Sequence, residues 1–339
     1  MAVNELLPRT NRAHELYGDF WFNGDPVIVS ALQGSVILVF FWDYAMAGSL
    51  RSLPYVQEWH RKYSSYGFVT AGVHTPRFAF GRKPDEVERA LGRLDVRFPV
   101  VMDNEGEIAA RYAVRVWPTL VLIDRHGFIR VQDPGGGSYQ SIERLIQSLL
   151  YETGVGEELP LPMDPLREAD REGAFCYRVT PEIHAGYLRG TLGNVEGYSP
   201  ESVVEYKDPG IYFDGRLYAN GSWGNNRDSL QFAPGSDEGQ IIIDYQGAGV
   251  SGVLSGDPEC EITVRQDDLY LTAANKGDDV RLGLDGRSFL VVKEPRLYSI
   301  VKSLEYGEHL LRLATSSGAF TVYTFSFSTS RIPELVSHN

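Results

Sequence analysis

Cysteine is scarce in this sequence. Its 339 residues contain two, Cys176 and Cys260, and the first half contains none. Two cysteines so far apart form neither a Cys-x-x-Cys redox pair nor a metal-binding motif. They could pair with each other, but two buried thiols are the simpler expectation in a chain without an export signal. The sequence therefore predicts no metal and no cofactor.

Long apolar runs and a basic excess are also missing. The longest apolar stretch, residues 35–42, has the length of a buried strand and is far too short to span a membrane. Residues 1–9 contain no apolar core of a secretory signal. The formal net charge of −13 disfavours binding to nucleic acid or anionic lipid, because both repel an acidic surface. We expect a cytoplasmic protein without membrane insertion or a nucleic-acid partner.

The composition is otherwise that of a globular protein. Hydrophobic residues make up 43% of the chain and aromatic residues 12%, which is enough to build a sizeable core. A length of 339 residues suits two domains better than one.

The first half alternates between strand and helix patterns. The apolar runs predict strands at 36–41, 68–73, 98–102, 119–124 and 128–132. Amphipathic spacing predicts helices at 48–66, 85–94, 105–112 and 139–150. Strands separated by helices, with a hairpin near the end, predict a mixed α/β sheet flanked by helices.

The pattern changes after this half. Residues 153–172 combine glycine and proline with acidic residues, which is typical of an interdomain linker. Short runs with regular turn signals follow, which predicts an all-β sandwich. We expect an α/β domain at 1–152, the linker at 153–172, the sandwich at 173–330 and a tail at 331–339.

One segment of the first half carries a family resemblance. The buried strand ends in Phe41-Trp42, a proline-containing helix follows, and Val116-Trp-Pro-Thr119 directly precedes a later strand. Together these resemble the thioredoxin-like fold of the TlpA/ResA-like, AhpC/TSA-related proteins. Leu50-Arg-Ser-Leu-Pro-Tyr55, Gly72-Val-His-Thr-Pro76 and Leu122-Ile-Asp-Arg-His-Gly127 match DipZ-type proteins more narrowly. The resemblance covers nearly all of residues 20–150.

The sequence departs from this family at the redox site. The resemblance places the two family cysteines at Met46 and Ser49, beside Trp42, Trp117 and a cis-Pro118. In the family the first cysteine attacks as a thiolate and the second resolves the mixed disulfide. Methionine and serine can do neither. We therefore expect no dithiol exchange, and the lack of cysteine in this half also excludes a peroxidase mechanism.

Other polar residues near this site have simpler interpretations. His74 follows a strand, and a structural histidine is a better expectation than a catalytic one, because no acid or nucleophile is placed with it. Asp43, Tyr44, Arg51 and Arg77 are expected to form a solvated rim.

The second half resembles the C-terminal domain of DipZ-type proteins, a jelly-roll sandwich similar to carbohydrate-binding modules. The similar runs lie at 180–190, 297–302, 307–313 and 323–327. Aromatic rings that stack on sugars, with polar neighbours, are the candidates for binding, although the same aromatic residues could pack the core. The candidate residues are Tyr187, Tyr212, Tyr218, Trp223, Asn225 and Arg227. The acidic pairs at 267–268 and 278–279 are expected to be solvated turns rather than a calcium site.

Three hypotheses follow. The first is a non-redox thioredoxin-like scaffold joined to a carbohydrate-binding-like domain, with a carbohydrate or a protein as its partner. The second is a thiol–disulfide oxidoreductase that uses a non-standard nucleophile, Cys176 or Cys260. The third is a purely structural partner domain.

Overall fold

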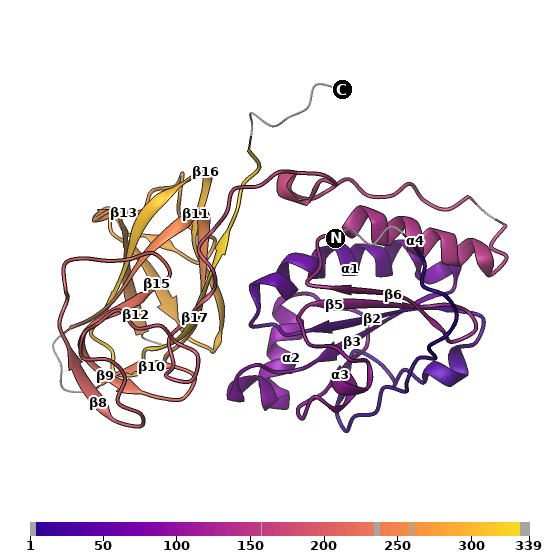
Figure 1. The fold of residues 1–339 in the computed structure, drawn as a ribbon, viewed down its shortest axis with the longest axis horizontal. Helices are drawn as coiled ribbons and strands as arrows, with labels where there is room; N and C mark the ends of the chain where they lie inside the picture. Colours follow the sequence, from indigo (N-terminus) through magenta and orange to yellow (C-terminus); the bar gives the residue numbers. More distant parts are fainter. Residues whose placement is uncertain (1–4, 157, 234–237, 258–259, 333–339) are drawn as a thin grey trace. The chain divides into compact units, whose positions relative to one another are not determined.

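A computed structural model describes residues 5–156, 158–233, 238–257 and 260–332 (Figure 1). The chain divides into two compact units, Met1–Gly173 and Ala174–Asn339, called unit 1 and unit 2 below. Most of the expected tail at 331–339 lies outside the described residues.

Unit 1 is built on a six-stranded sheet with the order β1-β4-β3-β2-β5-β6. Its strands are β1 (Trp21–Phe22), β2 (Val36–Trp42), β3 (Phe68–His74), β4 (Val100–Met102), β5 (Thr119–Ile123) and β6 (Ile129–Pro134). Strands β2, β3 and β4 are parallel, whereas β5 and β6 run antiparallel to their neighbours. Every residue of β2 is buried, as expected for a central strand covered on both faces.

Helices cover both faces of this sheet. They are α1 (Ala47–Tyr63), α2 (Pro84–Arg93), α3 (Glu107–Arg111) and α4 (Tyr139–Glu152), with short 3-10 turns η1 (Val29–Leu32), η2 (Ser64–Tyr66) and η3 (Ala79–Arg82) between them. Helices α1 and α4 lie side by side over one face (Figure 1), where Tyr55 and Tyr139 stack with ring centroids 3.8 Å apart. Helix α3 packs on the other face through Ile108 and Ala109. The mixed α/β arrangement agrees with the sequence pattern.

The segment expected to be a linker lies on unit 1. It contains η4 (Glu168–Asp170), and we call residues 159–173 the strap. The backbone N–H of Met163 donates to the buried carboxylate of Glu143 in α4, at 2.9 Å. Near the other end, Asp170 is buried and accepts hydrogen bonds from Arg51 and from the hydroxyl of Tyr55. Composition alone suggested a free connection, but buried carboxylates hold this segment against α1 and α4.

The described elements of unit 2 are all strands. They are β7 (Ile183–His184), β8 (Val203–Tyr206), β9 (Leu217–Asn225), β10 (Leu230–Phe232), β11 (Gly239–Ser255), β12 (Cys260–Gln266), β13 (Leu269–Tyr270), β14 (Arg281–Leu282), β15 (Ser288–Val292), β16 (Arg296–Thr315) and β17 (Thr321–Ser328). They join in one sheet whose main path is β14-β15-β12-β16-β11-β17-β10-β9-β8. The two longest strands, β11 and β16, pair antiparallel, and their register shifts near Gly247 and Val250.

Alternating side chains of these strands build one hydrophobic core. In β12, for example, Ile262 and Val264 are fully buried, whereas Glu261 and Arg265 are exposed. The core includes Trp223, whose ring lies 5.4 Å from that of Phe232. A strand-rich unit that buries one face of its strands agrees with the all-β expectation.

Candidate functional site at the start of helix α1

Three segments of unit 1 meet at the N-terminal end of α1. The peptide bond Trp117–Pro118 is cis, as the family resemblance implied. Helix α1 approaches this proline closely, because a Cβ atom added to Gly48 would lie 3.1 Å from Pro118 Cδ. The N–H of Gly135 donates to the carbonyl of Pro118 at 2.7 Å. The start of α1, the cis-proline loop and the loop after β6 therefore form one site.

A glycine is required where the third segment meets α1. Gly136 has a φ of +67°, in the left-handed region that disfavours other residues. A Cβ atom at this position would lie 2.7 Å from Ser52 Oγ. The hydroxyl of Ser52 is hydrogen-bonded to that of Tyr139 at 2.9 Å, which fixes it in place. The run of three glycines at 135–137 was visible in the sequence but was not assigned to the site.

The two positions expected for cysteines lie at this end of α1. Met46 is the residue before the first helical turn, and its carbonyl accepts the helical hydrogen bond from Leu50. Ser49 is fully buried, and its hydroxyl oxygen accepts a hydrogen bond from the N–H of Asp43 at 3.2 Å. Neither side chain carries a thiol. Ser49 here satisfies a backbone donor at the helix start, which is a structural role.

A buried acid joins the end of β2 to the loop after β3. The carboxylate of Asp43 accepts hydrogen bonds from the N–H groups of Ala45 and Arg77, both at 2.8 Å. His74 Nε2 lies 3.5 Å from the same carboxylate, and its ring stacks on Tyr44 with centroids 5.2 Å apart. His74 is completely buried, and the nearby acid is one that the sequence did not place with it, so its structural role stays a prediction.

Several residues expected at or beside the site are placed differently. Asp43 and Tyr44 are each 1% exposed, so the expectation of a solvated rim was wrong for both. Trp42, which was expected beside the redox site, is also completely buried, and its ring stacks on that of Phe40. Arg51 points to the strap, where it binds Asp170. The residues directly after β2 are buried, and the spacing of residues in the sequence does not reveal this burial.

Neither cysteine forms a disulfide, and both belong to unit 2. Cys260 is completely buried in the core of unit 2, and burial raises the pKa of its thiol. Cys176 is half-buried and forms an isolated β-bridge with Arg331. A raised pKa reduces the thiolate fraction, so Cys260 is poorly suited to act as a nucleophile.

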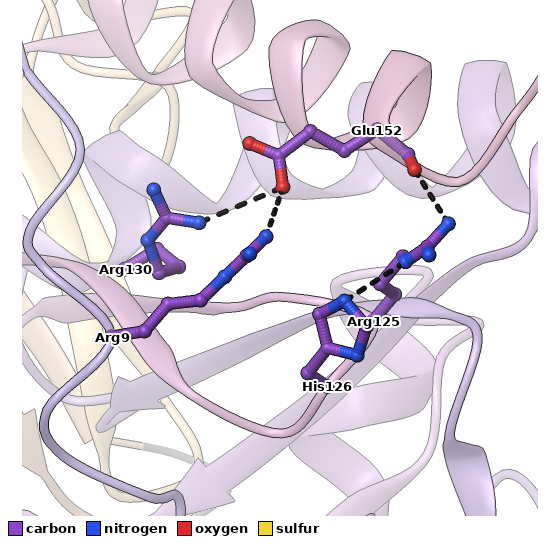
Figure 2. A pocket seen from close by; sticks show the side chains of 5 residues that line it. All are labelled: Arg9, Arg125, His126, Arg130 and Glu152. Carbon is purple, nitrogen blue, oxygen red and sulfur yellow. Dashed lines mark hydrogen bonds and ion pairs between the residues drawn. The ribbon is translucent and has the colours of Figure 1, made fainter.

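An open cavity of unit 1 lies elsewhere, and no motif in the sequence indicated it. Its volume is about 440 Å³, and it is lined by Arg9, Arg125, His126, Arg130 and Glu152 (Figure 2). Arg9 donates to Glu152 at 2.5 Å and Arg125 donates to the carbonyl of Glu152 at 2.7 Å. These contacts join the N-terminal segment, the β5–β6 hairpin and the end of α4. The charged residues that line this cavity therefore have a structural role, because they hold these three segments together.

The carbohydrate candidates of unit 2 do not form one surface. Tyr218, Trp223 and Asn225 are at most 1% exposed, so they were wrong as residues that contact a sugar. The alternation of β9 turns Trp223 toward the core with Leu217 and Ala219, and Trp223 donates from Nε1 to the carbonyl of Asn220 at 2.9 Å. Tyr218 points to the opposite face of the sheet, where Tyr212 packs against it.

Three of the candidates remain accessible. Tyr187 is half-buried and its hydroxyl donates to Glu201 at 2.9 Å. Arg227 is exposed, and Tyr212 is half-buried.

The acidic pairs of unit 2 are turns, as expected. Asp267 accepts the N–H of Leu310, and Asp268 binds Arg312. Asp279 accepts hydrogen bonds from Arg296 and the N–H of Ser299, and Asp278 pairs with Lys302. Within the described residues, no group of three or more histidine, cysteine or acidic side chains could hold a metal ion.

Comparisons with known proteins divide the chain at the same place. Residues 18–132 match the AhpC/TSA family, and residues 180–328 match the family described as a thioredoxin-like C-terminal domain. Unit 1 therefore has a thioredoxin-like fold, and it is similar to the AhpC/TSA family.

Individual relatives cover one or both units. Protein DipZ of Mycobacterium tuberculosis is 26% identical over 312 residues, which are 91% of this chain and 41% of DipZ. The thiol-disulfide oxidoreductase YkuV of Bacillus subtilis is 24% identical over 140 residues, 41% of this chain and 94% of YkuV. Among solved structures, a thiol-disulfide isomerase from Corynebacterium glutamicum is 24% identical in sequence, with a TM-score of 0.38. The match covers 41% of this chain and 95% of the isomerase chain.

The chain is thus a thioredoxin-fold protein of the TlpA/ResA/DipZ-like kind. It spans about two fifths of the length of the DipZ proteins that it matches. None of the helices in the described ranges is long and apolar enough to cross a membrane. The cytoplasmic location stays a prediction.

Proposed function

We propose that unit 1 is a binding domain that has lost thiol–disulfide exchange, and that unit 2 is a jelly-roll domain that binds carbohydrate. One observation carries the first part: Met46 and Ser49 stand at the start of α1, where the family's chemistry needs two thiols. The fold and the cis-Pro118 loop are retained, so the site can still bind while its chemistry is absent.

The surface of this site favours an extended polypeptide as the partner of unit 1. Val116, just before the cis bond, is 49% exposed, and Trp117 beside it is half-buried. Gly48 is exposed and lies against Pro118, so the backbone is open to close approach. An apolar side chain next to accessible backbone suits a peptide strand, which binds through main-chain hydrogen bonds and side-chain pockets.

The second part of the proposal is supported by the strand pattern of unit 2 and by its match to the C-terminal domain family. An oxidoreductase that uses a non-standard nucleophile is the competing function. Burial of Cys260 argues against this cysteine, which leaves Cys176 as the residue to test.

The redox part is tested by reduction of insulin in the presence of dithiothreitol. We expect the full chain to be no faster than dithiothreitol alone, because neither residue at the start of α1 can form a thiolate. An active thioredoxin serves as the positive control. Clear turnover that is lost in Cys176→Ser would contradict the proposal and identify the unusual nucleophile.

The binding part is tested with a peptide that has no thiol. Reduced, carboxymethylated insulin B chain is titrated into the protein, and backbone amide chemical shifts are followed by NMR. We expect the changes to cluster in residues 46–52, 116–119 and 135–137. Shifts spread over both faces of the unit 1 sheet, or no shifts at all, would contradict peptide binding at this site.

A further inference from the structure

Unit 2 carries a row of arginine and tyrosine side chains on the outward face of its sheet. Arg312 of β16 lies opposite Arg265 of β12, which in turn lies opposite Tyr270 of β13. Residues directly opposite each other in antiparallel strands point to the same face. The neighbouring residues Leu311 and Val264 are completely buried in the core. Because successive residues alternate between faces, the row points away from the core.

One end of the row is covered and the other is open. At the covered end, Tyr212 from the loop at 208–213 packs edge-on against Tyr218, with ring centroids 5.2 Å apart. At the open end, Arg265 is exposed and Tyr270 is half-buried. A ligand could therefore reach the row from the β12–β13 side.

Arg312 is fixed in the middle of the row by three partners. Its Nε donates to Asp268 at 2.9 Å, and Nη1 donates to Asp208 at 3.3 Å. Its Nη2 donates to the hydroxyl of Tyr212 at 3.1 Å, and this hydroxyl donates to Asp208 at 2.6 Å. A guanidinium bound on three sides cannot rotate away, so the group is preorganised.

The turn between β12 and β13 is a tight two-residue hairpin loop beside the row, a geometry that requires positive φ at both of its residues. Asp267 and Asp268 have φ values of 54° and 61°, which L-residues rarely adopt. The carboxylate of Asp267 accepts the N–H of Leu310 at 2.8 Å and contacts His309 Nδ1 at 2.7 Å.

The charges of the row cancel. Arg265 and Arg312 are balanced by Asp208 and Asp268, so a polyanion gains no net attraction here. The guanidinium of Arg265 lies 4.8 Å from the ring centre of Tyr270, and its Nη2 donates to that hydroxyl at 3.0 Å. Within the described part of the chain, Nε and Nη1 of Arg265 make no hydrogen bond. Planar donors, a carboxylate and an aromatic ring together suit a neutral polyhydroxylated ligand.

We propose that this face, from Arg312 to Tyr270, binds a neutral oligosaccharide. The inference rests on the proposed function of unit 2 and identifies the ligand class and the residues. The apolar C–H face of a sugar ring packs on Tyr270. Its hydroxyls accept from Arg265 and donate to the carboxylate of Asp268.

The test uses the full chain on a glycan array that contains neutral and uronic-acid-bearing oligosaccharides, followed by calorimetry with the strongest neutral glycan. We expect Tyr270→Ala and Arg265→Ala each to raise Kd by about tenfold, because each removes a stacking or donor group. Tyr306→Ala is the matched control, since this half-buried tyrosine of unit 2 stacks on Tyr177 outside the row, and it should change Kd by less than about twofold. Thermal melting confirms that the variants fold.

The outcomes that contradict the inference can be told apart. A neutral glycan that binds equally to Tyr270→Ala and Arg265→Ala would show that unit 2 binds sugar on another surface. A preference for acidic glycans, with affinity that falls steeply with salt, would contradict the neutral class. No bound glycan on the array would overturn both this inference and the carbohydrate function of unit 2, while leaving the proposal for unit 1 intact.

Discussion

The two units differ in which polar groups they bury. Unit 1 buries six carboxylate side chains, those of Asp43, Asp103, Asp124, Asp133, Glu143 and Asp170. The buried polar residues described in unit 2 are all uncharged: Thr180, Asn194, Asn225, Ser229, Gln266, Ser288, Thr315, Thr321 and Thr324.

The difference follows from how each unit satisfies its backbone. Unit 1 has helix starts and tight turns, where backbone N–H groups find no acceptor within the helix or turn itself and need a side chain to accept from them. Asp103, for example, accepts the N–H groups of Ile108 and Ala109 at 3.0 and 2.9 Å, at the start of α3. In unit 2 the long strands pair with one another, so few such donors remain. We therefore expect charge changes to act mainly on unit 1.

Glu143→Ala should have the largest effect on stability. The completely buried carboxylate accepts hydrogen bonds from Lys62 Nζ at 2.6 Å, the hydroxyl of Tyr63 at 2.7 Å and the N–H of Met163 at 2.9 Å. Its loss leaves a nearly buried lysine without its charge partner, which costs about 3–5 kcal/mol. Urea unfolding followed by hydrogen exchange and mass spectrometry assigns the loss to peptides of unit 1.

The control for this variant lies in unit 2. Asn225 is also completely buried and accepts the hydroxyl of Tyr206 at 2.7 Å, but it is neutral. Asn225→Ala should cost about 1–3 kcal/mol, the penalty of unsatisfied neutral groups. If it destabilised unit 2 as much as Glu143→Ala destabilises unit 1, the contrast in buried charge would not explain their stabilities.

Asp133→Asn should show a dependence on pH. Burial raises the pKa of Asp133 to about 6, above the value of about 3.9 in an unfolded chain. Between these values the folded state binds more protons, so the stability of the wild type falls as pH rises through this window. The stability of the variant does not fall in this window, because asparagine does not ionise. The free energy of unfolding of the variant, relative to that of the wild type, should therefore rise by up to about 3 kcal/mol between pH 4 and pH 7.

Equilibrium unfolding at several pH values measures this difference. A constant difference across the range would show that Asp133 is not buried as an ionisable group. Asn225→Ala in unit 2 removes no ionisable group and should show no comparable change in this window.

Asp170→Ala should loosen the strap with a smaller loss of stability. Its carboxylate binds Arg51 and Arg167, whose side chains are 39% and 43% exposed and can return to water. The hydroxyl of Tyr55 keeps the N–H of Leu166 as a donor. We expect a loss of about 1–2 kcal/mol.

Limited proteolysis with mapping of the fragments detects the released strap. Cleavage should increase within residues 159–173, and the two units should stay intact. Glu168→Ala is the matched control, because Glu168 in the same segment is 61% exposed and pairs with Arg171 on the surface. Equal cleavage in both variants would mean that Asp170 does not hold the strap.

The sequence predicted unit 1 better than unit 2. Helix α1 was expected at 48–66 and lies at Ala47–Tyr63, because its apolar spacing is strong. Strand β9 was not predicted, since Leu217–Asn225 is rich in glycine, asparagine and serine and is held by distant partners such as Gln240. Strand β16 covers two runs, 297–302 and 307–313, that the family resemblance kept separate. It continues through Gly307, which pairs with Gly247 of β11.

The candidate sites show the same difference. The sequence predicted that Met46, Ser49 and Pro118 lie together, because the family motifs that contain them occur in the expected order along the chain. The face around Arg312 could not be predicted, because Asp208 lies 104 positions away in the sequence and no motif joins them. Burial of Trp223 depends on strand alternation, and the unpredicted strand β9 left that alternation unassigned.

The most direct measurement restores the missing sulfur. In Met46→Cys/Ser49→Cys the two thiols stand at the start of α1 with two residues between them, as the family's redox pair requires. We predict that this variant reduces insulin at least about tenfold faster than the wild type, which stays at the dithiothreitol background. A wild type that is already active, or a double variant that forms its disulfide but remains inactive, would contradict the account.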